Sequence, residues 1–221
     1  MRYSWLFRHK ILREGIFNSI RDLCPQEQQL VLDVGCGKKR YRDLFRGAKY
    51  FGIDLPFSNS EGNRADVYGS ALALPFRDKT FDCVISTEVI EHVPDPVVFL
   101  SQVSKVLALE GCLLLSAPFF WPLHEEPYDF YRFTIHGLRE LLRKQGFTVK
   151  EVIKRGGFAS VMVQLAGDYF KTKNKMINTI TDVVFGILQV AAVWFDSIFP
   201  TEKYATGWTI KAIKNENSPH Q

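Results

Sequence analysis

The feature that most constrains the fold of this chain is a short apolar run that ends in two closely spaced glycines. Residues 31–37 read VLDVGCG, and residues 50–54 read YFGID. Each run predicts a buried strand, the first followed by a tight turn and the second ending on a carboxylate. In a parallel sheet, ligands bind where the strands end. Gly35 and Gly37 allow close approach of a ligand, and Asp54 stands where such folds place an acid for a ribose diol, so together they predict a nucleoside-containing cofactor.

The glycine pattern departs from the dinucleotide-binding fingerprint Gly-x-Gly-x-x-Gly. The third glycine of that fingerprint allows a helix to pack closely on a strand, and here Arg40 occupies its position. The sequence therefore disfavours a nicotinamide or flavin dinucleotide.

The segment Asp33-x-Gly35-x-Gly37 after an apolar strand resembles the first motif of the class I S-adenosylmethionine (SAM)-dependent methyltransferases, in particular those of methyltransferase type 11. Three later segments resemble further motifs of this family in the same order, and the resemblance covers roughly residues 28–155. The matching segments are residues 31–37, 69–76, 81–86 and 88–93. The resemblance implies that SAM is the methyl donor, S-adenosylhomocysteine (SAH) the product, and an oxygen or nitrogen of a small-molecule, glycan or lipid-linked acceptor the methylated atom.

The resemblance also implies which residues contact the cofactor. They are Asp33, Gly35, Gly37, Asp54, Leu55, Ser70, Ala71 and Glu88. One position departs from the family, because Ser70 stands where an Asp usually accepts from the adenine amine. A neutral hydroxyl is a weaker acceptor than a carboxylate. This departure keeps open an alternative function, that of a non-catalytic or membrane-associated accessory protein with a methyltransferase fold.

Alternation of strand and helix patterns predicts an α/β fold with a Rossmann-like, mostly parallel sheet and helices on both faces. We expect strands near residues 30–35, 49–54, 66–69, 82–87, 111–117, 147–154 and 207–214, and helices near 40–46, 96–108 and 135–145. The family resemblance implies that the last of the seven strands runs antiparallel to the sixth. Residues 1–27 form a separate N-terminal segment with helical spacing, which we expect to pack on the sheet rather than on a membrane.

An apolar insert, residues 158–205, separates the last two strands of a methyltransferase domain formed by residues 28–157 and 206–215. Residues 183–200 are nearly all apolar and long enough, at about 27 Å, to approach the thickness of a bilayer core. A single span would send the last strand to the wrong side of the membrane. Three roles stay open: a cap with an apolar substrate channel, which we rank first, a monotopic membrane contact, and a dimer interface.

The segment of residues 117–134 follows the fifth expected strand and is rich in proline, aromatic and ionisable residues. It resembles a loop in a methyltransferase subgroup that is associated with bacterial glycan and lipid biosynthesis. The matching positions are His124, Pro127, Asp129, Arg132 and Thr134. We predict that the catalytic residues lie in this loop.

His124 is the preferred general base, because an unperturbed imidazole titrates near neutrality. Asp129 is the alternative base or orients His124, and Arg132 either clamps an acidic acceptor or pairs with Asp129. Three further residues are expected to border the acceptor: His92, Tyr128 and Tyr131. No metal is expected, because the sequence contains no paired-histidine motif.

The composition limits the class of protein. A net charge of +4 does not by itself indicate a nucleic-acid partner. The four cysteines have no CxxC spacing, which favours free thiols in a reducing compartment, and the N-terminus has no secretory signal pattern. We therefore expect a cytoplasmic location, with membrane association and a homodimer as open alternatives.

Overall fold

The computed structural model describes residues 4–25, 27–56, 62, 64–172 and 174–216. Seven strands form one sheet in the order β3-β2-β1-β4-β5-β7-β6. Their bounds are β1 Leu30–Val34, β2 Lys49–Asp54, β3 Val67–Tyr68, β4 Phe81–Thr87, β5 Leu107–Pro118, β6 Phe147–Arg155 and β7 Gly207–Lys214. The first five strands run parallel, whereas β7 lies antiparallel between β5 and β6. The expected fold class is confirmed, including the antiparallel pairing of β7 with β6, and β7 also pairs with β5.

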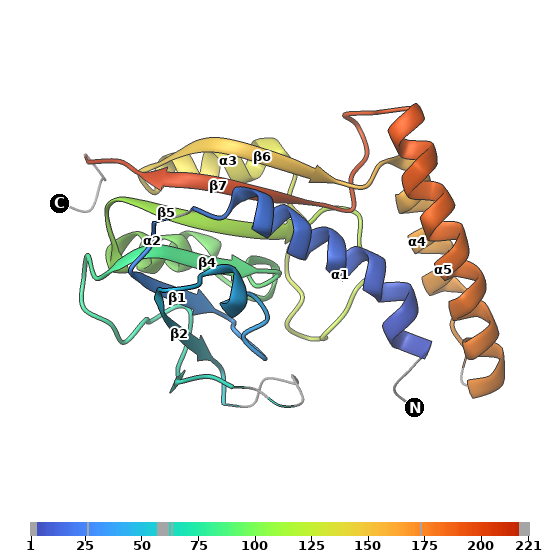
Figure 1. The fold of residues 1–221 in the computed structure, drawn as a ribbon, viewed down its shortest axis with the longest axis horizontal. Coiled ribbons are helices and arrows are strands. Elements are labelled where there is room, and N and C mark those ends of the chain that lie inside the picture. Colours follow the sequence, from blue (N-terminus) through green and yellow to red (C-terminus); the bar gives the residue numbers. More distant parts are fainter. Residues whose placement is uncertain (1–3, 26, 57–61, 63, 173, 217–221) are drawn as a thin grey trace.

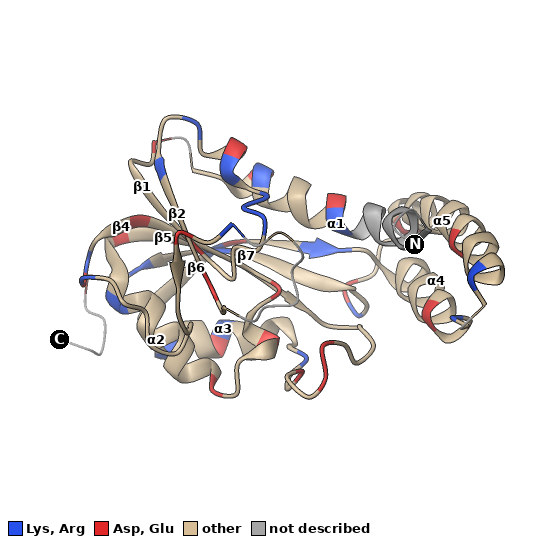
Figure 2. Cartoon of the chain, turned by 90° about the horizontal axis from the view of Figure 1, so that it is seen from below, with Lys and Arg blue, Asp and Glu red and all other residues tan. Residues whose placement is uncertain are grey.

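Helices cover both faces of this sheet (Figures 1 and 2). Their bounds are α1 Ser4–Leu23, α2 Pro96–Val106, α3 Ile135–Lys144, α4 Phe158–Tyr169 and α5 Lys175–Ile198, with short 3-10 turns η1 Arg42–Leu44 and η2 Ile90–His92. One core lies between the sheet and α2 and α3, where Phe99 and Leu138 are fully buried. The second lies between the sheet and α1, where Ile20 packs with Tyr41 and Phe45. Burying each such side chain contributes about 1.5–3 kcal/mol.

Two expected boundaries are wrong. The helix expected over residues 40–46 is only the 3-10 turn η1. The reason is that α1 already covers this face of the sheet, so the segment needs only to bury Tyr41 and Phe45 against it. Gly47, with a φ of +90°, then turns the chain into β2. Strand β5 begins at Leu107 instead of near residue 111, because Leu107 pairs with Phe81 of β4.

The insert folds into a helical hairpin of α4 and α5 at one end of the molecule (Figure 1). Asp196, near the end of α5, accepts hydrogen bonds from the backbone amides of Gly157, Ala159 and Ser160 at the start of α4. The carboxylate of one helix thus caps the other, which satisfies amides that a helix start otherwise leaves unpaired.

Candidate active site

The glycine turn, residues 35–37, follows β1 and lies at the crevice between β1 and β4, where the strand order reverses. Gly35 and Gly37 have φ values of +74° and +46°, which favour glycine. A Cβ on Gly35 would lie 2.3 Å from Val89 Cγ2. The amides of Gly35 and Cys36 donate to Ile53 O at 2.9 and 3.2 Å, which ties the turn to β2. Only glycine therefore fits at position 35.

Asp54 ends β2 next to this turn. Its Oδ2 accepts from Gly37 N at 2.8 Å and its Oδ1 from Leu55 N at 2.7 Å. Each carboxylate oxygen keeps a further lone pair, and the side chain is only half-buried. An oriented carboxylate beside a glycine turn, at the point where β1 has β2 on one side and β4 on the other, fits a ribose diol. The side chain of Leu55 is exposed beside it.

Asp33 lies on β1, two residues before Gly35, and its side chain is buried. Its side chain is 2% exposed, and Tyr50 donates a hydrogen bond to its Oδ2 at 2.6 Å. Burial raises the pKa of Asp33 to about 7, although the hydrogen bond from Tyr50 opposes the shift. Burial and the hydrogen bond from Tyr50 favour support of the turn over direct contact with a cofactor as the role of Asp33.

Ser70 and Ala71 follow β3, close to the end of β2, because Gly69 N donates to Asp54 O at 3.0 Å. The Ser70 side chain is exposed, and its Oγ accepts from Leu72 N at 3.1 Å. The hydroxyl therefore shapes its own turn and retains a donor and one lone pair for a ligand.

Glu88 follows the end of β4 in a left-handed conformation, with a φ of +53°. Such a conformation is rare for a residue with a side chain, and it is held here by hydrogen bonds to Ser116 and Arg155. Glu88 Oε1 accepts from Ser116 Oγ at 2.7 Å and from Arg155 Nη2 at 2.8 Å, and Glu88 N donates to Ser116 O at 3.2 Å. Gly35, Asp54 and Glu88 thus stand at the ends of three adjacent strands.

Beside Glu88 lies a pocket of about 460 Å³, called here the loop pocket. It opens between α1, the end of α4 and the loop of residues 119–134. Its lining includes Arg13, Glu88, Trp121, His124, Arg155 and Asp168. His124 is the member of this lining that the sequence predicted as the base.

Arg132 cross-links the 119–134 loop through its hydrogen bonds. Its Nη1 and Nη2 bind the two carboxylate oxygens of Asp129 at 2.6 and 2.7 Å. The other N–H groups donate to the backbone carbonyls of Trp121, Pro122 and Tyr131. All five donors of the guanidinium are engaged, so the predicted clamp on an acidic acceptor has no donor left. The geometry favours the other reading, a pair between Arg132 and Asp129.

Asp129 also holds His124. Its Oδ2 accepts from His124 N at 2.9 Å and lies 3.2 Å from His124 Nδ1. Burial raises the pKa of Asp129, but the hydrogen bonds from Arg132 and from the His124 amide outweigh it and lower the pKa to about 2. A carboxylate this acidic is a poor base near neutral pH, so Asp129 is better placed to orient His124.

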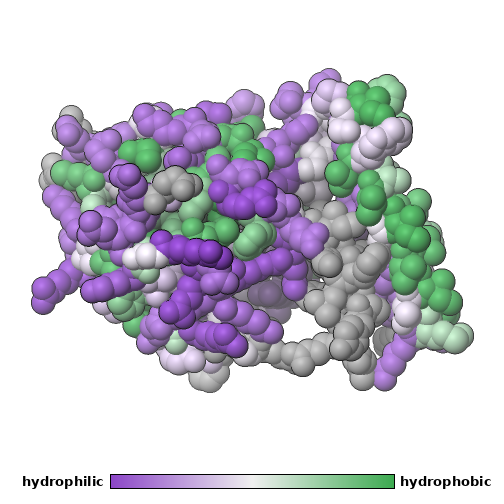
Figure 3. Space-filling model, in the orientation of Figure 1, coloured by the Kyte–Doolittle hydropathy of each residue, from purple (hydrophilic) through white to green (hydrophobic). Residues whose placement is uncertain are grey.

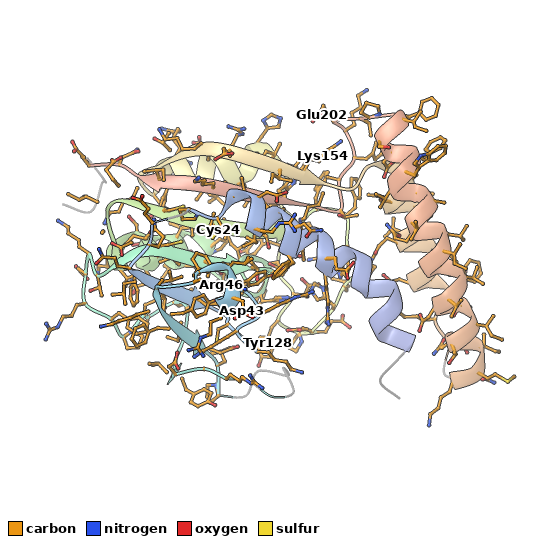
Figure 4. The ribbon with its side chains drawn as sticks, viewed as in Figure 1. Cys24, Asp43, Arg46, Tyr128, Lys154 and Glu202 are labelled. Atoms are coloured by element: carbon orange, nitrogen blue, oxygen red, sulfur yellow. The ribbon has the colours of Figure 1, made fainter. Side chains whose placement is uncertain are left out.

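The loop folds back onto η2. The rings of His92 and His124 lie with centroids 4.7 Å apart, and His92 Nδ1 is 2.7 Å from Tyr128 O. Tyr131 Oη donates to Pro94 O at 3.0 Å. The Tyr128 side chain lies in the outer part of the loop, away from the sheet (Figure 4). His92 and His124 are thus brought together. Tyr131 anchors the loop to Pro94, whereas the Tyr128 side chain is exposed.

Sequence reasoning missed two residues of this region. Arg155, at the end of β6, pairs with Glu88 and lines the loop pocket. Glu91 is fully buried, and burial together with the charge of Glu88 raises its pKa well above the usual range. The spacing Glu-x-x-Glu-His in residues 88–92 was the only available signal for Glu91.

Comparison with known proteins identifies the family. Residues 32–115 match the family described as a methyltransferase domain. Residues 32–115 of this chain therefore form a class I SAM-dependent methyltransferase domain. The matched residues run from β1 through most of β5 and so carry the glycine turn, Asp54 and Glu88. Methyltransferases of this family use SAM as the methyl donor.

Several similar proteins are methyltransferases. A probable SAM-dependent methyltransferase of Mycolicibacterium smegmatis is 28% identical over 67% of this chain and 61% of its own length. A fatty-acid O-methyltransferase of the same organism is 36% identical over 46% of this chain and 41% of its own. A solved SAM-dependent methyltransferase of Thermotoga maritima, described as a possible histamine N-methyltransferase, superimposes with a TM-score of 0.62 at 19% identity, over 96% and 93% of the two chains. The chain spans less than two thirds of the first curated relatives that it matches.

Proposed function

We propose that this methyltransferase transfers a methyl group from SAM to an oxygen or nitrogen of an apolar, lipid-linked small molecule while its hairpin rests on a membrane. The observation that carries the catalytic half is the convergence of Gly35, Asp54 and Glu88 at the ends of β1, β2 and β4, next to His124 in the loop pocket. The names of the relatives, among them a fatty-acid O-methyltransferase, support the acceptor class.

SAM supplies a methyl group on a positively charged sulfur when it is bound. In this proposal Asp54 accepts hydrogen bonds from the ribose hydroxyls, and the glycine turn lets the backbone approach the nucleoside. Glu88, held by Arg155 and Ser116, lies between this crevice and the loop pocket. The main task of the protein is to align the two reactants and exclude water, since the donor is intrinsically reactive.

His124 is the proposed general base for an acceptor that must lose a proton. Its Nδ1 lies 3.2 Å from Asp129 Oδ2 and 3.3 Å from Pro122 O, which are acceptors, and 3.4 Å from Arg132 Nη2, which is a donor. Nη2 already donates to Asp129 and Pro122 at shorter distances, so we place the proton of the imidazole on Nδ1. Nε2 then carries the lone pair that takes the acceptor's proton. Asp129, held by Arg132, fixes the imidazole in this tautomer, and this geometry supports an orienting rather than a basic role for Asp129.

The hairpin supports the membrane half of the proposal. Among the described residues, α5 is one helix that is long and apolar enough to cross a membrane. Its orientation is inverted relative to a helix of a water-soluble protein, because its polar residues Asp182 and Gln189 are buried. Its apolar residues are exposed, including Val183, Val184, Ile187, Leu188, Val190, Trp194 and Phe195. Figure 3 shows this apolar surface along α5, and Figure 2 shows how few charges the helix carries.

An exposed apolar surface of this size is normally covered by a partner, and we propose that a lipid surface covers it here. Lys171 and Lys175 lie at the turn between α4 and α5, where they can meet anionic headgroups, and Trp194 is suited to an interface. Most apolar side chains of α5 point outward, which supports a membrane contact over the cap with an apolar channel that the sequence led us to rank first.

The cofactor half is tested by calorimetry with SAH. We expect micromolar binding by the wild type and a loss of about 1.5–3 kcal/mol in Asp54→Ala, as for a hydrogen bond to a charged group. Asp78→Ala, an exposed carboxylate elsewhere in the domain, is the matched control and should bind normally. Absence of SAH binding by the folded wild type would reject the enzyme and favour the accessory-protein alternative. SAH release with fatty acids in detergent micelles then tests turnover.

The membrane half is tested by flotation with vesicles of anionic phospholipid. Ile187 and Trp194 are 62% and 66% exposed on α5, and Ile187→Ser with Trp194→Ser should abolish flotation. Val97→Ser, which changes an apolar residue 46% exposed on α2, is the control and should float like the wild type. Failure of the wild type to float, together with a dimer in light scattering that the double variant dissociates, would assign the surface to a homodimer instead.

A further inference from the structure

Three potential metal ligands from two separate segments meet beside the loop pocket. Glu91 and His92 come from η2, and His124 comes from the 119–134 loop. One ligand atom of each lies within 4.8 Å of the others. The side chain of Glu91 is fully buried, and those of His92 and His124 are 17% and 31% exposed. The cluster is therefore largely shielded from solvent, with His124 at its open side.

The two imidazoles are already oriented as metal ligands are. His92 Nδ1 lies 2.7 Å from Tyr128 O, so this nitrogen carries the proton. His124 Nδ1 faces Asp129 and Pro122 in the same sense. A carbonyl or carboxylate behind Nδ1 leaves Nε2 as a basic donor in a fixed direction, which is the usual outer-shell arrangement around ligating histidines. His92 Nε2 indeed points toward Glu91, at 3.7 Å from its Oε1.

Glu91 supplies the second, independent observation. Both of its carboxylate oxygens are buried, and within the described part of the chain neither has a hydrogen-bond partner. A buried carboxylate without partners is costly unless a charge compensates it. The nearby guanidinium of Arg155 binds Glu88 instead, and that of Arg132 binds Asp129. Among the described residues neither guanidinium hydrogen-bonds to Glu91, so both of its oxygens are open to a ligand.

We propose that Glu91, His92 and His124 bind one divalent transition-metal cation, of the kind represented by zinc, cobalt or manganese. One carboxylate and two imidazoles are a donor set that such cations favour. Donors around zinc lie about 3.4 Å apart for bonds near 2.1 Å, so each side chain needs to move inward by less than about 1 Å. Three protein ligands leave at least one coordination position open, as in catalytic sites.

The consequence for the reaction rests on the proposed function. An acceptor hydroxyl that enters from the loop pocket can take the open position, since His124 lines that pocket. A metal-bound hydroxyl is more acidic, so its O–H bond breaks with the electron pair left on oxygen and the proton passed to water. In the metal-loaded protein His124 is then a ligand, and the cation rather than the imidazole generates the nucleophile.

The test is a titration of the full, tag-free chain with Co²⁺ after removal of metal by a chelator. We expect one Co²⁺ per chain, seen as visible absorption bands, and displacement by Zn²⁺. Glu91→Gln, His92→Asn and His124→Asn should each weaken Co²⁺ binding at least tenfold. Glu140→Gln and His136→Asn, which change exposed residues of α3 outside the cluster, are matched controls and should bind like the wild type.

Glu91→Gln removes the charge with little change of shape, so it is the variant best able to keep its fold. SAH affinity of each variant, measured without metal, reports separately on the cofactor site. No Co²⁺ binding by a wild type that binds SAH would reject the metal site and leave the proposed function standing. Equal Co²⁺ binding by all variants, or intense near-ultraviolet thiolate bands, would place the metal elsewhere and overturn the proposal.

Discussion

Tyr50, on β2, donates a 2.6 Å hydrogen bond to the buried carboxylate of Asp33 on the adjacent strand β1. This pair lies directly below the glycine turn, so the charge state of Asp33 affects both stability and the site. Burial raises the pKa of Asp33 to about 7, which means that the folded protein binds this proton more tightly than the unfolded chain.

The pH dependence of stability should reveal this pair. An unfolded Asp titrates near 4, so the stability linked to Asp33 is present below about pH 4 and is lost as the pH rises toward 7. Asp33→Asn removes this titration. The free energy of unfolding of the variant, relative to that of the wild type, should therefore be about 4 kcal/mol higher at pH 8 than at pH 4. Urea unfolding across this range measures the gain. Asp78→Asn is the control, and parallel curves for Asp33→Asn and wild type would contradict the assignment.

Gly35→Ala should damage the glycine turn. The new Cβ would lie 2.3 Å from Val89 Cγ2, and the φ of +74° adds backbone strain. Together we expect a loss of about 2–4 kcal/mol in stability and at least a tenfold loss of SAH affinity. Thermal unfolding and calorimetry measure these effects. Gly15→Ala is the opposite case, because nothing lies within 4 Å of its Cβ in α1, and it should stabilise by about 0.5–1 kcal/mol.

Asp196→Ala should loosen the helical hairpin. Asp196 accepts from three backbone amides at the start of α4, and loss of such a cap costs about 1–2 kcal/mol. We expect faster proteolysis between α4 and α5 with nearly unchanged SAH affinity. Ser197→Ala, whose hydroxyl bonds only to Trp194 O among the described residues, is the neighbouring control. Equal cleavage rates for both variants would show that the cap does not hold the hairpin.

Arg132→Lys should disorganise the 119–134 loop while it keeps the charge. A lysine cannot reproduce the fork that binds both oxygens of Asp129 and three carbonyls. We expect a loss of about 1–3 kcal/mol in urea unfolding at neutral pH. The matched change Arg139→Lys, on the exposed side of α3, should cost nothing measurable. If the two variants unfold alike, Arg132 is free to act on the acceptor after all.

The strands and the cofactor crevice were predictable because their signals are local. Residues 31–37 predict a buried strand and a glycine turn within one short segment, and Asp54 is the last residue of the next apolar run. Parallel pairing then brings Gly35 and Asp54 together, since the carboxyl ends of adjacent parallel strands share an edge. The helix expected over residues 40–46 failed because its apolar residues serve a face already covered by α1, which local periodicity does not report.

The sequence by itself determined the fold family, the crevice and the apolar character of the insert, because all of these follow from the order and spacing of residues along the chain. Only the tertiary structure decided that the polar stripe of α5 faces inward and its apolar side faces out. Only the tertiary structure showed that every N–H donor of Arg132 is engaged in a hydrogen bond. It also brought Glu91, His92 and His124 within reach of one ion. Such contacts join segments far apart in sequence, so they depend on how the loop and hairpin pack, which residue spacing does not encode.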